Sequence, residues 1–314
     1  MIVDKDRVLI EVNPRFCEML GFKRSELIGK SAEIIHTSHK TFEEFGKKAF
    51  DQVRKQEVVN LEWPFKAKTG RKIWFRIAGD PVMGQEEVLW TVVDITERVE
   101  AQNRIEELAS KLSKYLSPQV YRSIFSGQKN VQIEANRKKL TVFFSDIKDF
   151  TELTDRLEPE VLSSLLNSYL NEMSKIALKY GGTIDKFVGD AILIFFGDPE
   201  TNGEKADATS CVLMALEMRE RMKFMRQIWE DEGISKPLNI RIGINTGYCN
   251  VGNFGSEDRL DYTIIGGEVN LASRLESNAS VGQILVSHET YSLIKNSITC
   301  EEREEINVKG LAHK

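Results

Sequence analysis

The stretch of residues 140–199 constrains the fold of this chain more than any other part of the sequence. Two apolar runs within it, Leu140–Phe144 and Ala191–Phe196, are short and rich in β-branched and aromatic residues, so they predict buried strands. Asp146 follows the first run, and Asp190 precedes the second run in a predicted tight turn. The pattern therefore places two carboxylates at the ends of neighbouring core strands.

Two interpretations of these aspartates follow from their positions. Paired carboxylates at strand ends supply the hard oxygen ligands that Mg²⁺ and Mn²⁺ prefer, and these are metals that bind phosphates. Alternatively, Asp146 and Asp190 each cap a turn and do nothing more, as most aspartates at strand ends do. The spacing alone leaves both interpretations open.

Composition excludes several classes of protein. With 41% hydrophobic and 29% charged residues, the 314-residue chain has the composition of a soluble globular protein long enough for two domains. Its net charge of -5 argues against a general nucleic-acid binder, which usually carries a basic stripe. It has no run of 18 apolar residues, so no membrane span is expected in this segment. Four widely spaced cysteines without a CxxC pair predict reduced thiols and a cytoplasmic location.

The first hundred residues alternate short strand-like runs with turns. Asn13 and Pro14 are typical of the start of a helix, and Lys68–Arg71 predicts the turn of a hairpin. A last strand is expected over residues 88–93. Together with the segments NPRFCEMLGFKRSELIGK and VVDITER, these features resemble a PAS sensor domain. The resemblance implies a small α/β fold whose strands cradle a ligand or serve in dimerisation.

The resemblance does not identify a PAS ligand. Cys17 lies in the early helix and not in the flavin-adduct motif of light-sensing PAS domains. His36 and His39 are candidate haem ligands, but two histidines in a loop-like stretch are far more often surface residues. An empty or purely structural PAS domain is the simpler hypothesis, so the ligand is left unknown.

Residues 96–115 differ from their flanks because they contain no glycine or proline and are rich in helix formers. These residues predict a helix, and its position between two domains favours a parallel two-chain coiled coil. Such a coiled coil can carry changes from a sensor to an output domain. The alternative is a single amphipathic helix that lies on its own domain. The apolar residues that set the heptad spacing are Ala101, Ile105, Leu108, Leu112 and Tyr115.

The last part of the chain predicts a mixture of strands and helices. Long amphipathic helices are expected over residues 159–180 and 204–229. A strand is expected over residues 238–245, followed by Thr246-Gly247 and then by further strands. Mixed strands with helices on one face suggest an α+β fold with a ferredoxin-like core.

Four motifs in this part look like the catalytic domain of a class III nucleotidyl cyclase. They are VFFSDIKDFT, FVGDAILIFFGDP, IRIGINTG and DYTIIGGEVNLASRLES, which occur in the family's order and cover about residues 138–311. Any one motif is weak evidence, but the joint match is highly specific. We therefore expect a PAS sensor domain over residues 1–95, a coiled-coil signalling helix and connector over 96–137, and a cyclase catalytic domain over 138–314.

The resemblance assigns catalytic roles to individual residues. Asp146 and Asp190 match the aspartates that bind two ions of Mg²⁺ or Mn²⁺, and the backbone carbonyl of Ile147 matches a further metal ligand. In the two-metal scheme, one ion lowers the pKa of the ribose 3′-hydroxyl and the other holds the β- and γ-phosphates. Asn270 and Arg274, four positions apart on one helix face, match a ribose-orienting asparagine and an arginine that stabilises the transition state.

Four further positions match residues that contact the nucleotide. Arg241 and Lys309 match triphosphate contacts, although the chain ends soon after Lys309. Lys186 and Thr263 stand where the family recognises the base: lysine with aspartate or threonine selects adenine, whereas glutamate and cysteine select guanine. A lysine donor suits a ring nitrogen of adenine, and a threonine oxygen can accept from its exocyclic amine. ATP is therefore the expected substrate.

This one chain carries both halves of a site that family members assemble from two subunits. We therefore expect a head-to-tail homodimer with two sites at its interface. The predicted function is adenylate cyclase, converting ATP to 3′,5′-cyclic AMP and pyrophosphate under the control of the PAS domain. The alternatives are a guanylate cyclase and a non-catalytic regulator that binds a nucleotide without turnover. Both ends of the sequence look cut, so we expect a piece of a longer protein.

Overall fold

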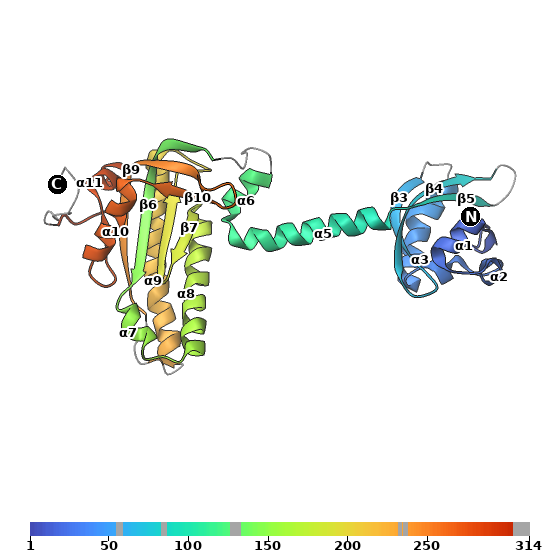
Figure 1. The fold of residues 1–314 in the computed structure, drawn as a ribbon, viewed down its shortest axis with the longest axis horizontal. Helices are drawn as coiled ribbons and strands as arrows, with labels where there is room; N and C mark the ends of the chain where they lie inside the picture. Colours follow the sequence, from blue (N-terminus) through green and yellow to red (C-terminus); the bar gives the residue numbers. More distant parts are fainter. Residues whose placement is uncertain (55–58, 83–86, 126–132, 232–233, 235–237, 304–314) are drawn as a thin grey trace. The chain divides into compact units, whose positions relative to one another are not determined.

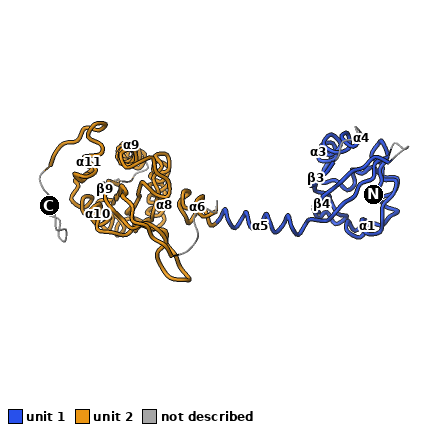
Figure 2. Tube along the Cα trace, turned by 90° about the horizontal axis from the view of Figure 1, so that it is seen from above, with its two compact units in different colours: residues 1–111 blue, residues 112–314 orange. Residues whose placement is uncertain are grey.

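The computed structural model divides the chain into two compact units, residues 1–111 and 112–314, which Figure 2 colours separately. Among the residues that it describes, no helix combines the length and the apolar character that a membrane span requires. The described residues are 1–54, 59–82, 87–125, 133–231, 234 and 238–303.

The first unit is built on an antiparallel sheet whose described strands have the order β2-β1-β5-β4-β3. The strands are β1 (Ile2–Val3), β2 (Leu9–Glu11), β3 (Val59–Lys66), β4 (Lys72–Pro81) and β5 (Val88–Asp94). The helices are α1 (Pro14–Leu20), α2 (Arg24–Leu27), the 3₁₀ helix η1 (Ala32–Ile35), α3 (His39–Phe45), the π-helix η2 (Gly46–Phe50) and α4 (Asp51–Arg54).

Local sequence explains how this unit folds. The Asn13 side chain accepts a hydrogen bond of 2.8 Å from the amide of Phe16, so the predicted helix start is confirmed. Ile73, Phe75 and Ile77 alternate along β4 and are buried, because every second side chain of a strand points to the same face. They share one apolar core with side chains from α1, α3 and η2. The sheet therefore has one face covered by helices.

The segment after the first sheet is helical, with α5 (Thr96–Leu112), the 3₁₀ helix η3 (Ser113–Tyr115) and α6 (Pro118–Phe125). The start of α5 is anchored by Thr96, whose hydroxyl accepts a hydrogen bond of 3.0 Å from the Trp74 amide. The predicted heptad seam is more than half exposed at its last four positions, Ile105, Leu108, Leu112 and Tyr115. The described part of the chain therefore leaves this apolar seam largely uncovered.

The second unit contains a mostly antiparallel sheet with the described strand order β10-β9-β6-β8-β7, and β11 pairs with β9 in parallel. The α+β class expected from the sequence is confirmed. The strands are β6 (Ala135–Ile147), β7 (Thr183–Val188), β8 (Ala191–Phe196), β9 (Ile240–Gly255), β10 (Leu260–Ile265) and β11 (Ile284–Val286). The helices are α7 (Phe150–Thr154), α8 (Pro159–Lys179), α9 (Glu204–Asp231), α10 (Gly267–Asn278) and α11 (His288–Ile294).

Helices cover both faces of this sheet, and not one face as the sequence suggested (Figure 1). Phe143 of β6 packs in a large core with α8, α9 and α11. Its neighbour Val142 points to the opposite face and packs in a smaller core with Ala272 of α10. Gly243 of β9 allows this approach, because a Cβ there would collide with the backbone of α10 at Ala272. The backbone of α10 is therefore held directly against β9.

Strand β9 runs through Thr246-Gly247, where the sequence suggested that a shorter strand ends. It pairs with β6 from Ile240 to Gly252 without interruption. Gly247 leaves room for the side chain of Glu268, whose carboxyl carbon would lie 2.5 Å from a Cβ at this position. The glycine thus marks a close side-chain approach and not a turn.

Candidate active site

The two aspartates that the sequence singled out meet in the structure. Asp146 lies at the end of β6, and Asp190 lies in the turn between β7 and β8, the strand next to β6. The backbone amide of Ile147 donates a hydrogen bond of 3.0 Å to Oδ2 of Asp190. Burial raises the pKa of Asp190 to about 6, helped by a hydrogen bond to the Asp146 carboxyl group and by its charge. The two carboxyl groups are therefore direct neighbours.

This donor set fits a divalent cation. Two adjacent carboxylates repel each other when both are ionised, and a bound cation would remove that repulsion. No group of three or more His, Cys, Asp or Glu side chains with metal-binding geometry occurs among the described residues. A metal at this site would therefore take two carboxylates from the chain and complete its shell with backbone, water or phosphate oxygens, as Mg²⁺ commonly does.

Arg241 ties Asp146 to helix α10. It lies opposite Asp146 in the pairing of β6 with β9, and its guanidinium is 3.1 Å from Oδ2 of Asp146. Its Nε is 2.9 Å from Oε1 of Glu276, which is an ion pair without the alignment of a hydrogen bond. Burial raises the pKa of Glu276, while the charge of Arg241 opposes that rise. The triphosphate contact expected for Arg241 stays a prediction.

Glu276 was not identified from the sequence, although a signal was present. It lies four residues after Ala272 on the buried stripe of α10, where a charged residue needs a partner. The partner, Arg241, is distant in the sequence, so the spacing could not reveal it.

Asn270 and Arg274 lie on the other side of α10. The buried residues Ala272 and Glu276 face β9 and Arg241. Asn270 and Arg274 each precede one of them by two positions, which corresponds to a rotation of roughly 200° around a helix. Asn270 is exposed and Arg274 is partly exposed. These two side chains therefore point away from the side of α10 that reaches the chain's own Asp146.

The two predicted base-contacting residues are linked by a third residue, Asp185. Oγ1 of Thr263 donates a hydrogen bond of 2.7 Å to Oδ2 of Asp185, and the ammonium of Lys186 is 3.5 Å from Oδ1. Asp185 could not be identified from the sequence, because its partner Thr263 is 78 positions away. The structure brings Lys186 and Thr263 together through this carboxylate. The remaining predicted contact, Lys309, lies outside the described residues.

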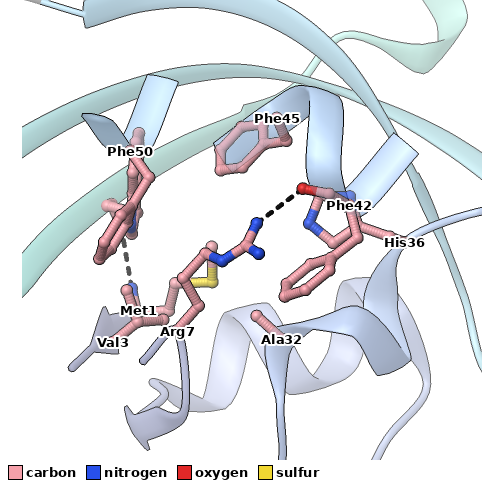
Figure 3. A pocket seen from close by; sticks show the side chains of 9 residues that line it. Met1, Val3, Arg7, Ala32, His36, Phe42, Phe45 and Phe50 are labelled. Atoms are coloured by element: carbon pink, nitrogen blue, oxygen red, sulfur yellow. Dashed lines mark hydrogen bonds between the residues drawn. The ribbon is translucent and has the colours of Figure 1, made fainter. Parts of the chain in front are cut away.

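A second candidate site is a cavity in the first unit (Figure 3). The side chain of Arg7 extends into it and donates a hydrogen bond of 2.7 Å to the backbone oxygen of Phe42. The free volume is about 10 Å³, which is the space that one water molecule needs. A larger ligand would require Arg7 or its neighbours to move.

One wall of this cavity is His36, which is only 2% exposed, so the expectation of a surface position is wrong. Its ring packs against the rings of Phe42, Phe45 and Phe65. Burial, aided by the charge of Arg7, lowers its pKa from 6.5 to about 3. His39, in contrast, is exposed and pairs with Glu33. The two histidines therefore have different surroundings.

We predict that His36 makes the stability of the PAS domain dependent on pH. The unfolded chain binds a proton at His36 below pH 6.5, and the folded chain does so only near pH 3. Stability is therefore full above pH 6.5 and lost as the pH falls, by about 2 kcal/mol at pH 5. Urea unfolding at pH 5 and pH 8 should show a smaller pH dependence for His36→Leu. The matched variant His39→Gln should keep the pH dependence of the wild type. An equal change in the free energy of unfolding between pH 5 and pH 8 for wild type and His36→Leu would contradict the prediction.

Fold and carboxylate pair together define a class III nucleotidyl cyclase domain, and comparison with known proteins supports this class. The model of the "Adenylate and Guanylate cyclase catalytic domain" family matches residues 132–314, and a PAS domain model matches residues 1–97. The chain belongs to the adenylate and guanylate cyclase family and carries an N-terminal PAS domain.

Several solved structures and curated relatives are similar to this chain. The structure of the adenylyl cyclase CyaB from P. aeruginosa is 65% identical, covers 58% of this chain and 92% of its own, and has a TM-score of 0.57. The guanylyl cyclase Cya2 is 35% identical, with 57% and 89% covered and a TM-score of 0.54. "Adenylate cyclase, terminal-differentiation specific" of Dictyostelium discoideum is 35% identical over 63% of this chain. "Adenylate cyclase 1" of Rhizobium meliloti is 32% identical over 59% of this chain. These matches span only 9% and 27% of the two curated relatives.

Proposed function

We propose that this protein is an adenylate cyclase that converts ATP to 3′,5′-cyclic AMP and pyrophosphate. The observation that carries the proposal is the meeting of the Asp146 and Asp190 carboxyl groups beside the backbone of Ile147. Mg²⁺ or Mn²⁺, two ions per site, would supply the positive charge that activates the ribose 3′-hydroxyl and neutralises phosphate oxygens. The two carboxylates and the Ile147 carbonyl would hold these ions, and Arg241 would keep Asp146 in position.

The remaining catalytic groups are proposed to come from a second copy of the chain. The amide of Asn270 would orient the ribose, and the guanidinium of Arg274 would spread the charge that develops on the phosphorus in the transition state. The orientation of α10 supports this arrangement, because both side chains point away from the chain's own Asp146. Arg241 and Lys309 would contact the triphosphate. The assembly would be a head-to-tail homodimer with two sites at its interface.

The exposed seam of α5 supports the same dimer. Ile105, Leu108 and Leu112 are 61%, 53% and 57% exposed, and a parallel coiled coil would bury them against the partner's seam. We propose that the PAS domain of residues 1–95 acts through the helix and connector of residues 96–137 on the catalytic domain of residues 138–314.

We also propose that the protein works in the cytoplasm, where its four free thiols would stay reduced.

ATP is proposed as the substrate because of the polar groups at the base positions. Lys186 can donate to a ring nitrogen of adenine, and the Thr263 oxygen can accept from the exocyclic amine. The 65% identity to a protein titled adenylyl cyclase points the same way. Guanylate cyclase is the second candidate, because a protein titled guanylyl cyclase is 35% identical over a similar span.

We predict that the double variant Lys186→Glu/Thr263→Cys shifts the preference from ATP toward GTP. Each substitution removes one hydrogen bond suited to adenine, so the ratio of kcat/KM for ATP over GTP should fall roughly a hundredfold. The assay measures cyclic AMP and cyclic GMP with Mg²⁺ and with Mn²⁺. Lys175→Glu, which changes an exposed lysine of α8, is the charge control and should leave the ratio unchanged. A wild-type preference for GTP would overturn the substrate assignment.

The non-catalytic regulator remains a competing hypothesis with a clear signature. Such a protein would bind ATP but form no cyclic product with either metal. The complete set of Asp146, Asp190, Asn270 and Arg274 argues against it, because a protein that only binds nucleotides does not need transition-state groups. Nucleotide binding without turnover by the full chain would favour the regulator.

A further inference from the structure

We infer that Asp185 is a specificity-determining residue, which makes the Thr263 hydroxyl a hydrogen-bond acceptor toward the base and thereby selects adenine. This inference rests on the proposed function, in which Lys186 and Thr263 contact the base. It assigns Asp185 a positioning role, because the carboxylate acts through Thr263 and does not touch the nucleotide itself.

The Thr263 hydroxyl is fixed in one direction by its contact with Asp185. A threonine hydroxyl has one proton to donate and two lone pairs that accept. The single proton of Thr263 is directed to Oδ2 of Asp185 at 2.7 Å. The oxygen therefore has only lone pairs left for a ligand. An amine that donates, such as the exocyclic amine of adenine, satisfies it, whereas the O6 acceptor of guanine meets lone pairs of the same sign.

Asp185 is itself held as a hydrogen-bond acceptor. Its side chain is 1% exposed, so it cannot turn to solvent. Besides the hydrogen bond from the Thr263 hydroxyl, it accepts one of 3.4 Å from the backbone amide of Ile264, and the ammonium of Lys186 lies 3.5 Å away. Burial raises the pKa of Asp185, while these three groups oppose that rise. A carboxylate surrounded by donors keeps the Thr263 proton pointed away from the ligand.

Lys186 is the other proposed base contact. Its ammonium lies beside Oδ1 of Asp185, and its side chain is 43% exposed. Next to this carboxylate the site therefore offers a donor, Lys186, and an acceptor, Thr263, and Asp185 fixes only the acceptor, because its ion pair with the exposed Lys186 is weak. Adenine presents the complementary pair, a ring-nitrogen acceptor next to an amine donor.

A purely structural role is the competing explanation, because Asp185 also connects two strands. It lies on β7, while Thr263 and Ile264 lie on β10, at the other end of the strand order. A residue that only joins these strands would affect stability and the rates with both nucleotides equally. A residue that decides whether the Thr263 hydroxyl donates or accepts toward the base changes the ratio of kcat/KM for ATP over GTP.

The test compares kcat/KM for ATP and GTP in the full-length protein. Asp185→Ala frees the Thr263 hydroxyl to rotate and donate to guanine, so the ATP over GTP ratio should fall about tenfold, the value of one hydrogen bond. Tyr262→Phe is the matched control, because it removes a neighbouring contact of β10 with Asp198 and should leave the ratio unchanged. An unchanged ratio in folded Asp185→Ala protein would overturn the inference.

A double-mutant cycle asks whether Asp185 acts through Thr263. In a Thr263→Val background no hydroxyl remains to be oriented, so adding Asp185→Ala should change the ratio by less than about twofold. A further tenfold fall in that background would contradict the assigned role. The wild-type preference tests the proposed function separately: a wild type that prefers GTP refutes the adenylate cyclase assignment, whereas a wild type that prefers ATP with an unaltered variant ratio refutes only the role of Asp185.

Discussion

Replacing Asp190 by asparagine is expected to lower the cyclase rate by at least about a hundredfold at saturating Mg²⁺ or Mn²⁺. The side chain keeps its shape, so the hydrogen bond from the Ile147 amide can persist. The variant loses one of the two carboxylates, Asp146 and Asp190, that meet at this site. The measurement is the rate of cyclic AMP formation over a titration of Mn²⁺. The unfolding temperature is measured with and without Mn²⁺ as well, and the ion is expected to raise it in the wild type and less in the variant.

Measuring the unfolding temperature of the metal-free proteins separates a loss of cyclase activity from misfolding. The pKa of Asp190 is raised from 3.8 to about 6, so the folded state holds this proton more tightly than the unfolded state. The contribution of Asp190 to the free energy of unfolding of the wild type therefore falls as the pH rises from about 4 to 6. Above pH 6 the ionised carboxylate destabilises the folded state to its full extent. Asparagine carries no charge, so the metal-free variant should unfold at a higher temperature than the wild type above pH 6. The difference should vanish near pH 4.

Asp149→Asn is the matched control for this experiment. Asp149 is exposed and lies three residues after Asp146. Its replacement by asparagine is the same chemical change, but it leaves the carboxylate pair intact. Its activity and its response to Mn²⁺ should match the wild type. Retention of wild-type activity by Asp190→Asn would remove the basis of the metal site.

The meeting of Asp146 and Asp190 was predictable because it depends on local patterns. Short apolar runs marked β8 and the buried part of β6; Asp146 follows the β6 run, and Asp190 immediately precedes the β8 run. The hairpin between β7 and β8 fixed the position of Asp190. Since β6 and β8 are neighbours in the sheet, local sequence and simple pairing were sufficient to bring Asp146 and Asp190 together.

The residues that the sequence did not reveal are those whose partners are distant in the chain. Asp185 and Glu276 are ordinary charged residues by spacing, and only the folded sheet brings them to Thr263 and Arg241. The strand that begins near Leu238 was expected to end before Thr246-Gly247, whereas β9 continues to Gly255 and Gly247 makes room for Glu268. In each case the deciding contact comes from another strand or helix, and no local pattern encodes it.

A mixture of two inactive variants provides the strongest test of the shared site. Asp146→Ala and Arg274→Ala chains should each lose nearly all activity, but together they should regain about a quarter of the wild-type rate. Random pairing makes half of the dimers mixed, and each mixed dimer has one site with an intact aspartate from one chain and an intact arginine from the other. Coexpression of the two chains allows pairing during folding, and the rate per dimer is then measured.

The reverse combination distinguishes shared sites from sites within one chain. A chain that carries both substitutions, coexpressed with an equal amount of wild type, should also leave about a quarter of the activity, because every mixed dimer has one defect in each site. Sites formed within a single chain would instead give no recovery in the first mixture and about half the wild-type activity in the second. The expected pair of results follows from α10, which turns Glu276 toward its own Asp146 and therefore directs Arg274 to the opposite side of the helix.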